Sequence, residues 1–235
     1  MKVLVSIWLW CIGLLYFGFF LVVGLMCTYL FSPATYDPWI KAMMRFLFTL
    51  LRSPVVLEGD TNFDSGATYL FMSNHVSLFD LPLLAGYIPV FFRGIEASYQ
   101  FDWPVYGWFV RRYGNIGIER ESIHSSITSI RQAERMLKSG VSLTILPEGY
   151  RSLDGQLRPF KKLPFHLAQK AGVPIVPIGL SGMTSLKRKG HWLIRPTRVK
   201  IKFGEIIPAE MVHSLSNEEL RDLTRERIQD LIERA

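Results

Sequence analysis

A histidine and an aspartate stand five residues apart in the segment NHVSLFD, residues 74–80, directly after a short apolar run that is typical of a buried strand. A neutral imidazole has nearly the pKa that a general base needs, and a neighbouring carboxylate can fix its tautomer and stabilise the imidazolium. On a regular helix the two side chains would point about 140° apart, so His75 and Asp80 can meet only if the chain turns between them. Pro82 is consistent with a helix that begins there. Spacing alone leaves two explanations, a pair that takes a proton from a hydroxyl or two unrelated caps, and it slightly favours the caps.

The segment PEGYRS, residues 147–152, also follows an apolar run and offers groups that suit a phosphorylated ligand. Gly149 allows a tight turn and the close approach of a ligand, and Arg151 can bind a phosphate through two parallel hydrogen bonds. Glu148 can accept a hydrogen bond from a hydroxyl or orient a neighbouring base. An ordinary strand-to-loop turn with a solvated ion pair explains the segment equally well.

Two further segments carry weaker signals. In GNIGIER, residues 114–120, two glycines flank a short strand and Arg120 could face a phosphate, although a surface arginine is the default interpretation. In VPIVPI, residues 173–178, two prolines bracket an apolar strand. We interpret this second segment as mainly structural, with an end that could line a pocket for an apolar chain.

Apolar runs and helical patterns alternate through residues 55–235, which predicts an α/β fold with a central, largely parallel or mixed sheet flanked by helices. The predicted strands are residues 68–73, 90–93, 115–118, 141–146, 175–180 and 198–203. Residues 122–139 predict a helix that Gly140 ends, and Ser216 with Glu219 predicts a capping box at the start of the last helix. The sequence has no linker long enough to divide residues 55–235, so they are expected to form one domain.

Residues 3–31 contain no charged residue. As one helix they would be about 43 Å long, which exceeds the roughly 30 Å of a bilayer's hydrocarbon core. The segment is therefore expected to anchor the chain in a membrane, either by spanning it with a tilt or by breaking near Gly18 or Gly24 and lying partly in the interface. A cleaved signal peptide is disfavoured, because its apolar region is about 7–15 residues long and residues 32–34 form a poor cleavage site.

Residues 36–52 have the pattern of an amphipathic basic helix, with Lys41, Arg45 and Arg52 on one side and apolar residues on the other. We expect this helix to lie in the membrane interface, so that residues 1–54 form the anchoring region. A core helix of the following domain is the alternative. The three charges outweigh Lys2 at the other end of the apolar segment, which by the positive-inside rule predicts that residues 55–235 lie on the cytoplasmic face.

The net charge of +7 suits a partner that carries phosphate, namely nucleic acid, an anionic membrane or a phosphorylated substrate. The apolar segment favours lipid, and no basic–aromatic module in the sequence supports nucleic-acid binding. The histidines at 124, 166, 191 and 213 lack the spacing of metal ligands, so no metal site is expected. An esterase would need a nucleophile elbow, which the sequence lacks. A lipid-binding protein without catalysis is the remaining alternative class.

Taken together, the four segments resemble the boxes of the glycerolipid acyltransferases typified by 1-acylglycerol-3-phosphate acyltransferase, and they occur in the same order. The family's boxes read N-H-x-x-x-x-D, G-x-I-x-x-x-R, P-E-G-T-R-S and V-P-I-V-P, and here they fall within about residues 70–180. The resemblance implies that His75 is a general base and that Asp80 orients it. The residues that it implies for binding a glycerol phosphate are Arg120, Glu148, Gly149 and Arg151.

The reaction that the resemblance implies is a direct transfer of a fatty acyl group from acyl-CoA or an acyl-carrier protein to the sn-2 hydroxyl of lysophosphatidic acid, without a cofactor. Tyr150 replaces the threonine of the third box, and the lysine usual in the second box would fall at Ala97 or Ser98, with Arg93 the nearest basic residue. Both changes touch the region expected to hold the head group, so another lysolipid is an alternative acceptor. The basic run at residues 187–189 is expected to contact anionic head groups or an acidic carrier protein, unless it is a solvated loop.

Overall fold

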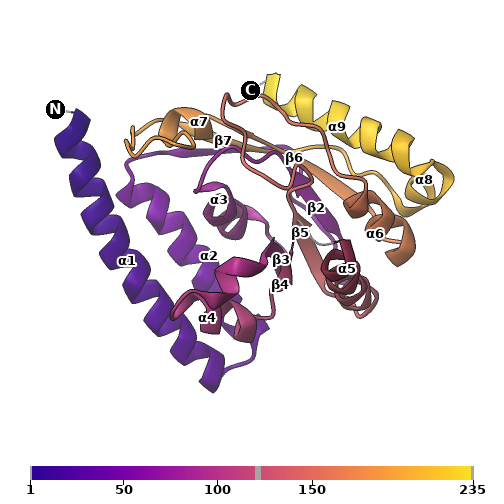
Figure 1. Cartoon of the computed structure of the whole chain (residues 1–235), viewed down its shortest axis with the longest axis horizontal. Coiled ribbons are helices and arrows are strands. Elements are labelled where there is room, and N and C mark those ends of the chain that lie inside the picture. The colour runs from indigo at the N-terminus through magenta and orange to yellow at the C-terminus, as the bar shows by residue number, and fades with distance from the viewer. Residues whose placement is uncertain (1, 120–122, 234–235) are drawn as a thin grey trace.

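The centre of the protein is a seven-stranded mixed sheet (Figure 1). The computed structural model describes residues 2–119 and 123–233. The strands are β1 (Val55–Glu58), β2 (Leu70–Ser73), β3 (Phe92–Ala97), β4 (Ile116–Ile118), β5 (Ser142–Ile145), β6 (Ile175–Ser181) and β7 (Val199–Phe203). Their order is β1-β7-β6-β2-β5-β3-β4, and the pairs from β6 to β4 are all parallel. Strand β7 runs antiparallel to β6 and parallel to β1, so the predicted α/β fold with a largely parallel sheet is confirmed.

Nine α-helices and one 3₁₀ helix are found in the described part of the chain. They are α1 (Lys2–Leu30), α2 (Pro33–Leu50), α3 (Asp80–Tyr87), η1 (Ser98–Asp102), α4 (Tyr106–Tyr113), α5 (Ile123–Lys138), α6 (Leu163–Ala171), α7 (Met183–Leu186), α8 (Ala209–Ser214) and α9 (Asn217–Glu233). The predicted capping box begins α9: Glu219 Oε2 accepts the Ser216 N–H at 2.8 Å, and Ser216 Oγ accepts the Glu219 N–H at 3.3 Å. Gly140, at a φ of +89°, follows the end of α5 as expected.

Helices cover both faces of the sheet, and the alternation of side chains along β2 explains how. Phe71 points into a core shared with α2 and α3, whereas Leu70 and Met72 point into a second core shared with α5, α6 and α9. Figure 1 shows the two groups of helices on opposite sides of the strands. All of β2 is buried, so its carboxyl end lies at the middle of the molecule.

Helix α1 is long and apolar enough to cross a membrane, with a mean hydropathy of 2.3 over its best window, of which 22% is buried. It lies against α2 and α4 along one edge of the molecule (Figure 1). Near its N-terminus it also contacts the loop before β7. Ser6 Oγ donates to the Ile194 carbonyl at 3.0 Å and accepts the Ile194 N–H at 3.1 Å, and Trp10 Nε1 donates to the Trp192 carbonyl at 2.6 Å.

The structure corrects the expectation that Lys41 faces the membrane interface. The Lys41 ammonium is buried, forms an ion pair with Asp37 one turn earlier, and donates to the carbonyls of Pro89 at 3.1 Å and Val90 at 3.0 Å. An ammonium enclosed in this way is not available to lipid head groups. The i,i+4 spacing of Asp37 and Lys41 is the reason, because it places the two charges on the same face of the helix.

The apolar side of α2 belongs to the core of the α/β domain. Leu47, Phe48 and Leu51 are buried in the same cluster as strand residues of β2, β6 and β7. The packing of α2 therefore matches the alternative of a core helix rather than a helix that lies only in the interface. Arg45 and Arg52 remain exposed, and Arg45 donates to the Gly86 carbonyl at 2.9 Å.

Candidate active site

The first and third sequence segments meet at the carboxyl ends of neighbouring strands of the sheet. Strand β2 lies between β5 and β6 and is parallel to both. Residues 74–80 follow β2 and residues 147–152 follow β5, whereas residues 173–178 lead into β6 and lie alongside β2 itself. The carboxyl ends of parallel strands are where open α/β sheets bind their ligands, so the topology brings the first and third segments together at such a position.

His75 and Asp80 form a hydrogen-bonded pair. His75 Nδ1 lies 2.8 Å from Asp80 Oδ2, with the Asp80 side chain fully buried and the His75 side chain 12% exposed. The chain turns between them as predicted, because Asp80 is the first residue of α3. A proton on Nδ1 that is donated to Asp80 leaves Nε2 as the nitrogen that can accept one.

Asp80 also holds the turn that brings the pair together. Its Oδ2 accepts the N–H groups of Val76 at 2.7 Å and Ser77 at 2.8 Å, in addition to the imidazole. The two explanations left open by the spacing are therefore compatible, since one carboxylate both caps the turn and orients the ring.

The main chain of His75 is fixed from both sides by the third segment. Its N–H donates to Glu148 Oε1 at 2.6 Å, and its carbonyl accepts the Ser152 N–H at 2.8 Å. Glu148 Oε2 accepts the Arg158 N–H at 2.9 Å. Burial raises the pKa of Glu148 to about 7, although the hydrogen bonds from Arg158 and His75 oppose that shift. Both Glu148 oxygens thus hold backbone in this structure.

Asn74 ties the end of β2 to the end of β6. Its Nδ2 donates to the Leu180 carbonyl at 3.0 Å, and its Oδ1 accepts the Leu180 N–H at 2.8 Å. The side-chain amide reproduces the donor and acceptor of a peptide unit, so it extends the pairing of the strands beyond Ser73. The residues of β6 up to Leu180 are fully buried, which agrees with a structural role for the fourth segment.

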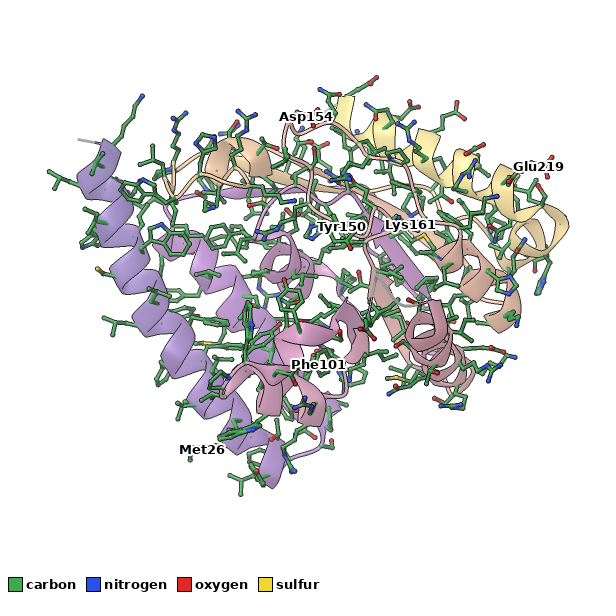
Figure 2. The ribbon with its side chains drawn as sticks, in the orientation of Figure 1. Met26, Phe101, Tyr150, Asp154, Lys161 and Glu219 are labelled. Atoms are coloured by element: carbon green, nitrogen blue, oxygen red, sulfur yellow. The ribbon has the colours of Figure 1, made fainter. Side chains whose placement is uncertain are left out.

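A group of basic side chains lies beside the third segment. Gly149 has a φ of +76°, which favours glycine, and the half-buried Arg151 follows two residues later. Lys189 Nζ donates to the Arg151 carbonyl at 3.0 Å. Lys187 is buried, and burial, followed by the charge of Arg151, lowers its pKa. Figure 2 shows Tyr150 near the centre of the molecule, on this same segment.

The second segment contributes less to the described site. Arg120 lies outside the described residues. Arg93 does not take the place of the lysine usual in the second box, because its guanidinium is buried between two rings, 3.9 Å from the centroid of Phe91 and 4.1 Å from that of Tyr113. In the described part of the chain, no group of three His, Cys, Asp or Glu side chains is arranged to hold a metal ion.

Two contributors to the site were not recognised in the sequence. Asn74 was part of the first segment, but its partner Leu180 is 106 residues away, and no local pattern reveals that contact. Lys187 was included in a basic run, where charge alone could not separate it from a solvated loop. Its carbonyl accepts a hydrogen bond from Ser77 Oγ at 2.9 Å, which places it directly against the first segment.

Comparison with known proteins gives one matching family. A family model described as Acyltransferase matches residues 54–181, more than half of the chain and all four sequence segments. A 1-acyl-sn-glycerol-3-phosphate acyltransferase from Cocos nucifera is 32% identical over 73% of this chain and 59% of its own length. A lyso-ornithine lipid O-acyltransferase from Pseudomonas aeruginosa is 35% identical over 48% of this chain and 42% of its own. The chain therefore spans less than two thirds of these relatives.

A solved structure matches the entire chain. The crystal structure of PlsC from Thermotoga maritima, a 1-acyl-sn-glycerophosphate (LPA) acyltransferase, superposes with a TM-score of 0.85. The match covers 100% of this chain and 97% of that one at 27% identity. The helices at the N-terminus are therefore part of the shared architecture, together with the sheet.

Proposed function

Because this chain belongs to the acyltransferase family, we propose that it transfers a fatty acyl group from an acyl thioester to the sn-2 hydroxyl of lysophosphatidic acid and so makes phosphatidic acid. The observation that carries the proposal is the His75–Asp80 pair, joined at 2.8 Å at the carboxyl end of β2. A base held in one tautomer beside basic side chains suits the activation of a hydroxyl on a phosphorylated lipid.

In the proposed mechanism, His75 Nε2 takes the proton of the acceptor hydroxyl while that oxygen attacks the thioester carbonyl. Asp80 stabilises the imidazolium that forms. The tetrahedral intermediate then collapses, the carbon–sulfur bond breaks, and the imidazolium returns its proton to the leaving thiolate. The transfer is direct, so it needs neither a covalent enzyme intermediate nor a metal or prosthetic group.

Arg151, Gly149 and Arg120 are proposed to bind the acceptor's phosphate. Support for Arg151 comes from its place three residues after Glu148, whose carboxylate fixes the backbone of His75. Gly149 has no side chain to block close approach to its backbone, and a Cβ added there would meet only the Lys161 side chain, at 3.8 Å. Glu148 is proposed to act through His75 as a positioning residue, since its oxygens accept main-chain N–H groups.

A different lysolipid is the second candidate acceptor. Tyr150 stands where the third box usually has a threonine, and one of the relatives is named for a lyso-ornithine lipid. Both acceptors would use the same base and the same thioester chemistry. They differ in the head group, which is the part of the ligand expected next to residues 149–151.

We further propose that α1 attaches the enzyme to a membrane with its α/β domain on the cytoplasmic face. The length and hydropathy of α1 support attachment. For the orientation, the support comes from the exposed Arg45 and Arg52, which follow α1 in the chain, whereas Lys2 alone stands at the other end of the helix.

The test of the function is a product assay. The purified full-length protein is incubated with labelled acyl-CoA or acyl-carrier protein and a panel of lysolipids, and the product is identified by mass. We expect phosphatidic acid from lysophosphatidic acid. A product formed only from another lysolipid would replace the acceptor and keep the reaction, and the absence of any acylated product would contradict the proposed function.

The test of the mechanism is His75→Ala. Removing the general base is expected to lower kcat by about 10²–10⁴-fold without changing the thermal unfolding of the protein. The matched control is His166→Ala, because His166 is exposed on α6 and far from the pair in sequence; it should retain full activity. A His75→Ala enzyme within twofold of the wild type would contradict the assignment.

A further inference from the structure

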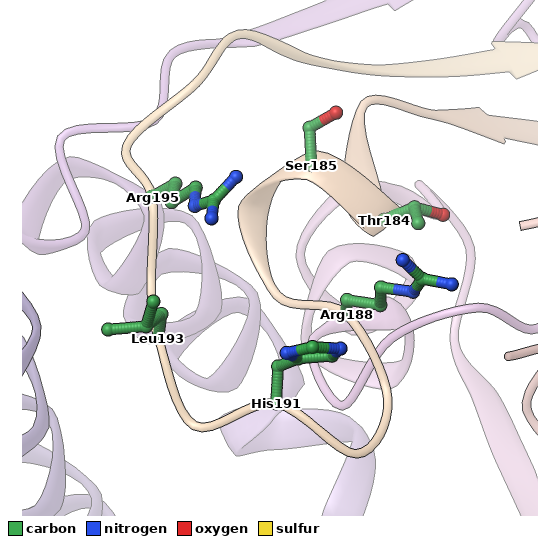
Figure 3. A pocket seen from close by; sticks show the side chains of 6 residues that line it. All are labelled: Thr184, Ser185, Arg188, His191, Leu193 and Arg195. Atoms are coloured by element: carbon green, nitrogen blue, oxygen red, sulfur yellow. The ribbon is translucent and has the colours of Figure 1, made fainter. Parts of the chain in front are cut away.

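A second basic site lies outside the four boxes, between α7 and the loop that follows it. This pocket has a volume of about 250 Å³. The residues that line it are Thr184, Ser185, Arg188, His191, Leu193 and Arg195. Figure 3 shows Thr184 and Ser185 on α7 and the remaining side chains on the loop.

The lining of the pocket is suited to an anion with several oxygens. It offers two guanidinium groups, one imidazole and two hydroxyls, and it includes no carboxylate. None of the ion pairs found among the described residues involves Arg188 or Arg195. The exposed Asp154 is near Arg188, but the pKa of its carboxyl is lowered mainly by hydrogen bonds from Ser152 and Gln156. Guanidinium groups favour phosphate as a ligand because they present paired donors.

The pocket adjoins the active site but is separate from it. Arg188 Nε donates to the Leu153 carbonyl at 2.8 Å, one residue beyond the Ser152 that binds the His75 carbonyl. At the start of the loop, the Lys187 carbonyl accepts the Ser77 hydroxyl. A ligand whose reacting atom lies at His75 could therefore reach the pocket with a part that is remote from that atom.

The covalent structures of the two substrates show which of them carries phosphate far from its reacting atom. In a lysophospholipid the phosphate is only a few bonds from the hydroxyl that reacts, so it belongs beside His75 and Arg151. In acyl-CoA the pantetheine arm separates the thioester from the diphosphate and from the 3′-phosphate of the nucleotide. We propose that the pocket binds the phosphates of the nucleotide portion of acyl-CoA, and that a CoA thioester is accordingly the donor.

This inference rests on the proposed function for the place of the thioester at His75, and its first test uses donors that differ only in the nucleotide. The variant Arg195→Gln removes one guanidinium, and Arg188→Gln/Arg195→Gln removes both. We expect the KM for acyl-CoA to rise about tenfold in the single variant, the loss of one charge-assisted contact, with kcat nearly unchanged. The KM for the matching acyl-pantetheine, which has no nucleotide, should stay the same.

The control variant is Arg135→Gln, which removes the same charge from the exposed surface of α5. It should leave both KM values unchanged. Equal changes in KM for acyl-CoA and acyl-pantetheine in the Arg195→Gln enzyme would overturn the proposal. A wild-type enzyme that accepts acyl-carrier protein but not acyl-CoA would overturn it as well.

A binding measurement separates this proposal from the proposed function, because it requires no turnover. Adenosine 3′,5′-bisphosphate is titrated calorimetrically into the wild-type protein and the variants in detergent. Binding that is lost in Arg188→Gln/Arg195→Gln and kept in Arg135→Gln would support the pocket, even for an enzyme with no measured activity. No binding to the wild type would overturn it. Loss of binding to phosphatidylglycerol vesicles in the double variant, with unchanged nucleotide binding, would assign the pocket to a lipid head group instead.

Discussion

At the scale of single residues, two buried carboxylates support the same histidine in different ways. Asp80 contacts the imidazole and fixes its tautomer, whereas Glu148 contacts the backbone of His75 and fixes the position of the residue. Asp80 gains three donors at one oxygen, including two main-chain N–H groups. Burial removes water from the Glu148 carboxylate, and this desolvation raises its pKa to about 7.

The pKa of Glu148 predicts how stability depends on pH. Its folded value is raised above the ordinary 4.5, so between about pH 4.5 and pH 7 the unfolded chain loses this proton before the native protein does. The stability that protonated Glu148 contributes to the folded protein is fully present below pH 4.5 and is lost as the pH rises through 7. Its size is about 3 kcal/mol in the free energy of unfolding.

The measurement is chemical denaturation in detergent at a series of pH values, with wild type and Glu148→Gln compared. The neutral amide removes the titration, so the difference in free energy of unfolding between the two proteins should change with pH across this window in the direction given above. The variant also loses one acceptor for the N–H of His75 or Arg158. A difference that is constant from pH 4.5 to pH 7 would show that Glu148 does not titrate there.

At the scale of elements, the candidate active site depends on how the ends of β2, β5 and β6 are joined. The side chain of Asn74 joins the end of β2 to β6 through two hydrogen bonds to the backbone of Leu180. Asn74→Ala would leave a buried N–H and a buried carbonyl of Leu180 without these partners. Each orphaned group costs roughly 1–3 kcal/mol, so we expect a destabilisation of about 3 kcal/mol in urea unfolding.

The control for this prediction is Asn62→Ala, at an exposed position in the loop between β1 and β2. Exposed substitutions of this kind usually change stability by about 0.5 kcal/mol or less. If the two variants were destabilised equally, the link between Asn74 and Leu180 would not hold the strands together.

Local sequence patterns predicted most elements but not their partners. Six strands and the α5 and α9 helices followed from apolar runs and capping residues, with ends that differ from the structure by a few residues. Strand β1 was not predicted, because Val55–Glu58 is short, only partly buried and at the edge of the sheet. The antiparallel pairing of β6 with β7 also left no local signal, since it depends on contacts between distant residues.

The site shows the same division between local and distant information. The contact of His75 with Asp80 required only a local turn, so the spacing and the neighbouring boxes were enough to predict it. The role of Lys41 was predicted wrongly, because the helical pattern revealed a basic face but not that α3 and its following residues would cover it. Lys187 reaches the first box from 110 residues away, a distance over which the sequence alone carries no pattern.

At the scale of the whole molecule, α1 is docked on the domain rather than tethered to it. Leu9 of α1 lies in the same buried cluster as residues of the sheet. Ser6 contributes a hydrogen bond in each direction to Ile194, in the loop that carries the pocket. The orientation of α1 relative to the candidate active site is therefore fixed by specific contacts.

Ser6→Ala tests this docking. The variant leaves the Ile194 N–H without its acceptor, and we expect a faster amide hydrogen exchange of roughly 5–30-fold in residues 190–195, the equivalent of about 1–2 kcal/mol in local opening. Exchange in α5 should not change. Ser139→Ala, at an exposed serine after α5, serves as the control and should leave the loop unaffected. Unchanged exchange in residues 190–195 of the Ser6→Ala protein would contradict the docking role.

The contact between Ser6 and Ile194 also has a thermodynamic consequence for the coupling between α1 and the pocket. The loop that accepts α1 is the loop that lines the pocket, so docking of the helix and occupation of the pocket both favour the same ordered loop. Coupling of this kind is reciprocal: whatever factor the docked helix adds to the affinity of the pocket, a bound ligand adds to the docking of the helix. Occupation of the proposed pocket and docking of α1 on the domain would thus be linked through a single segment of the chain.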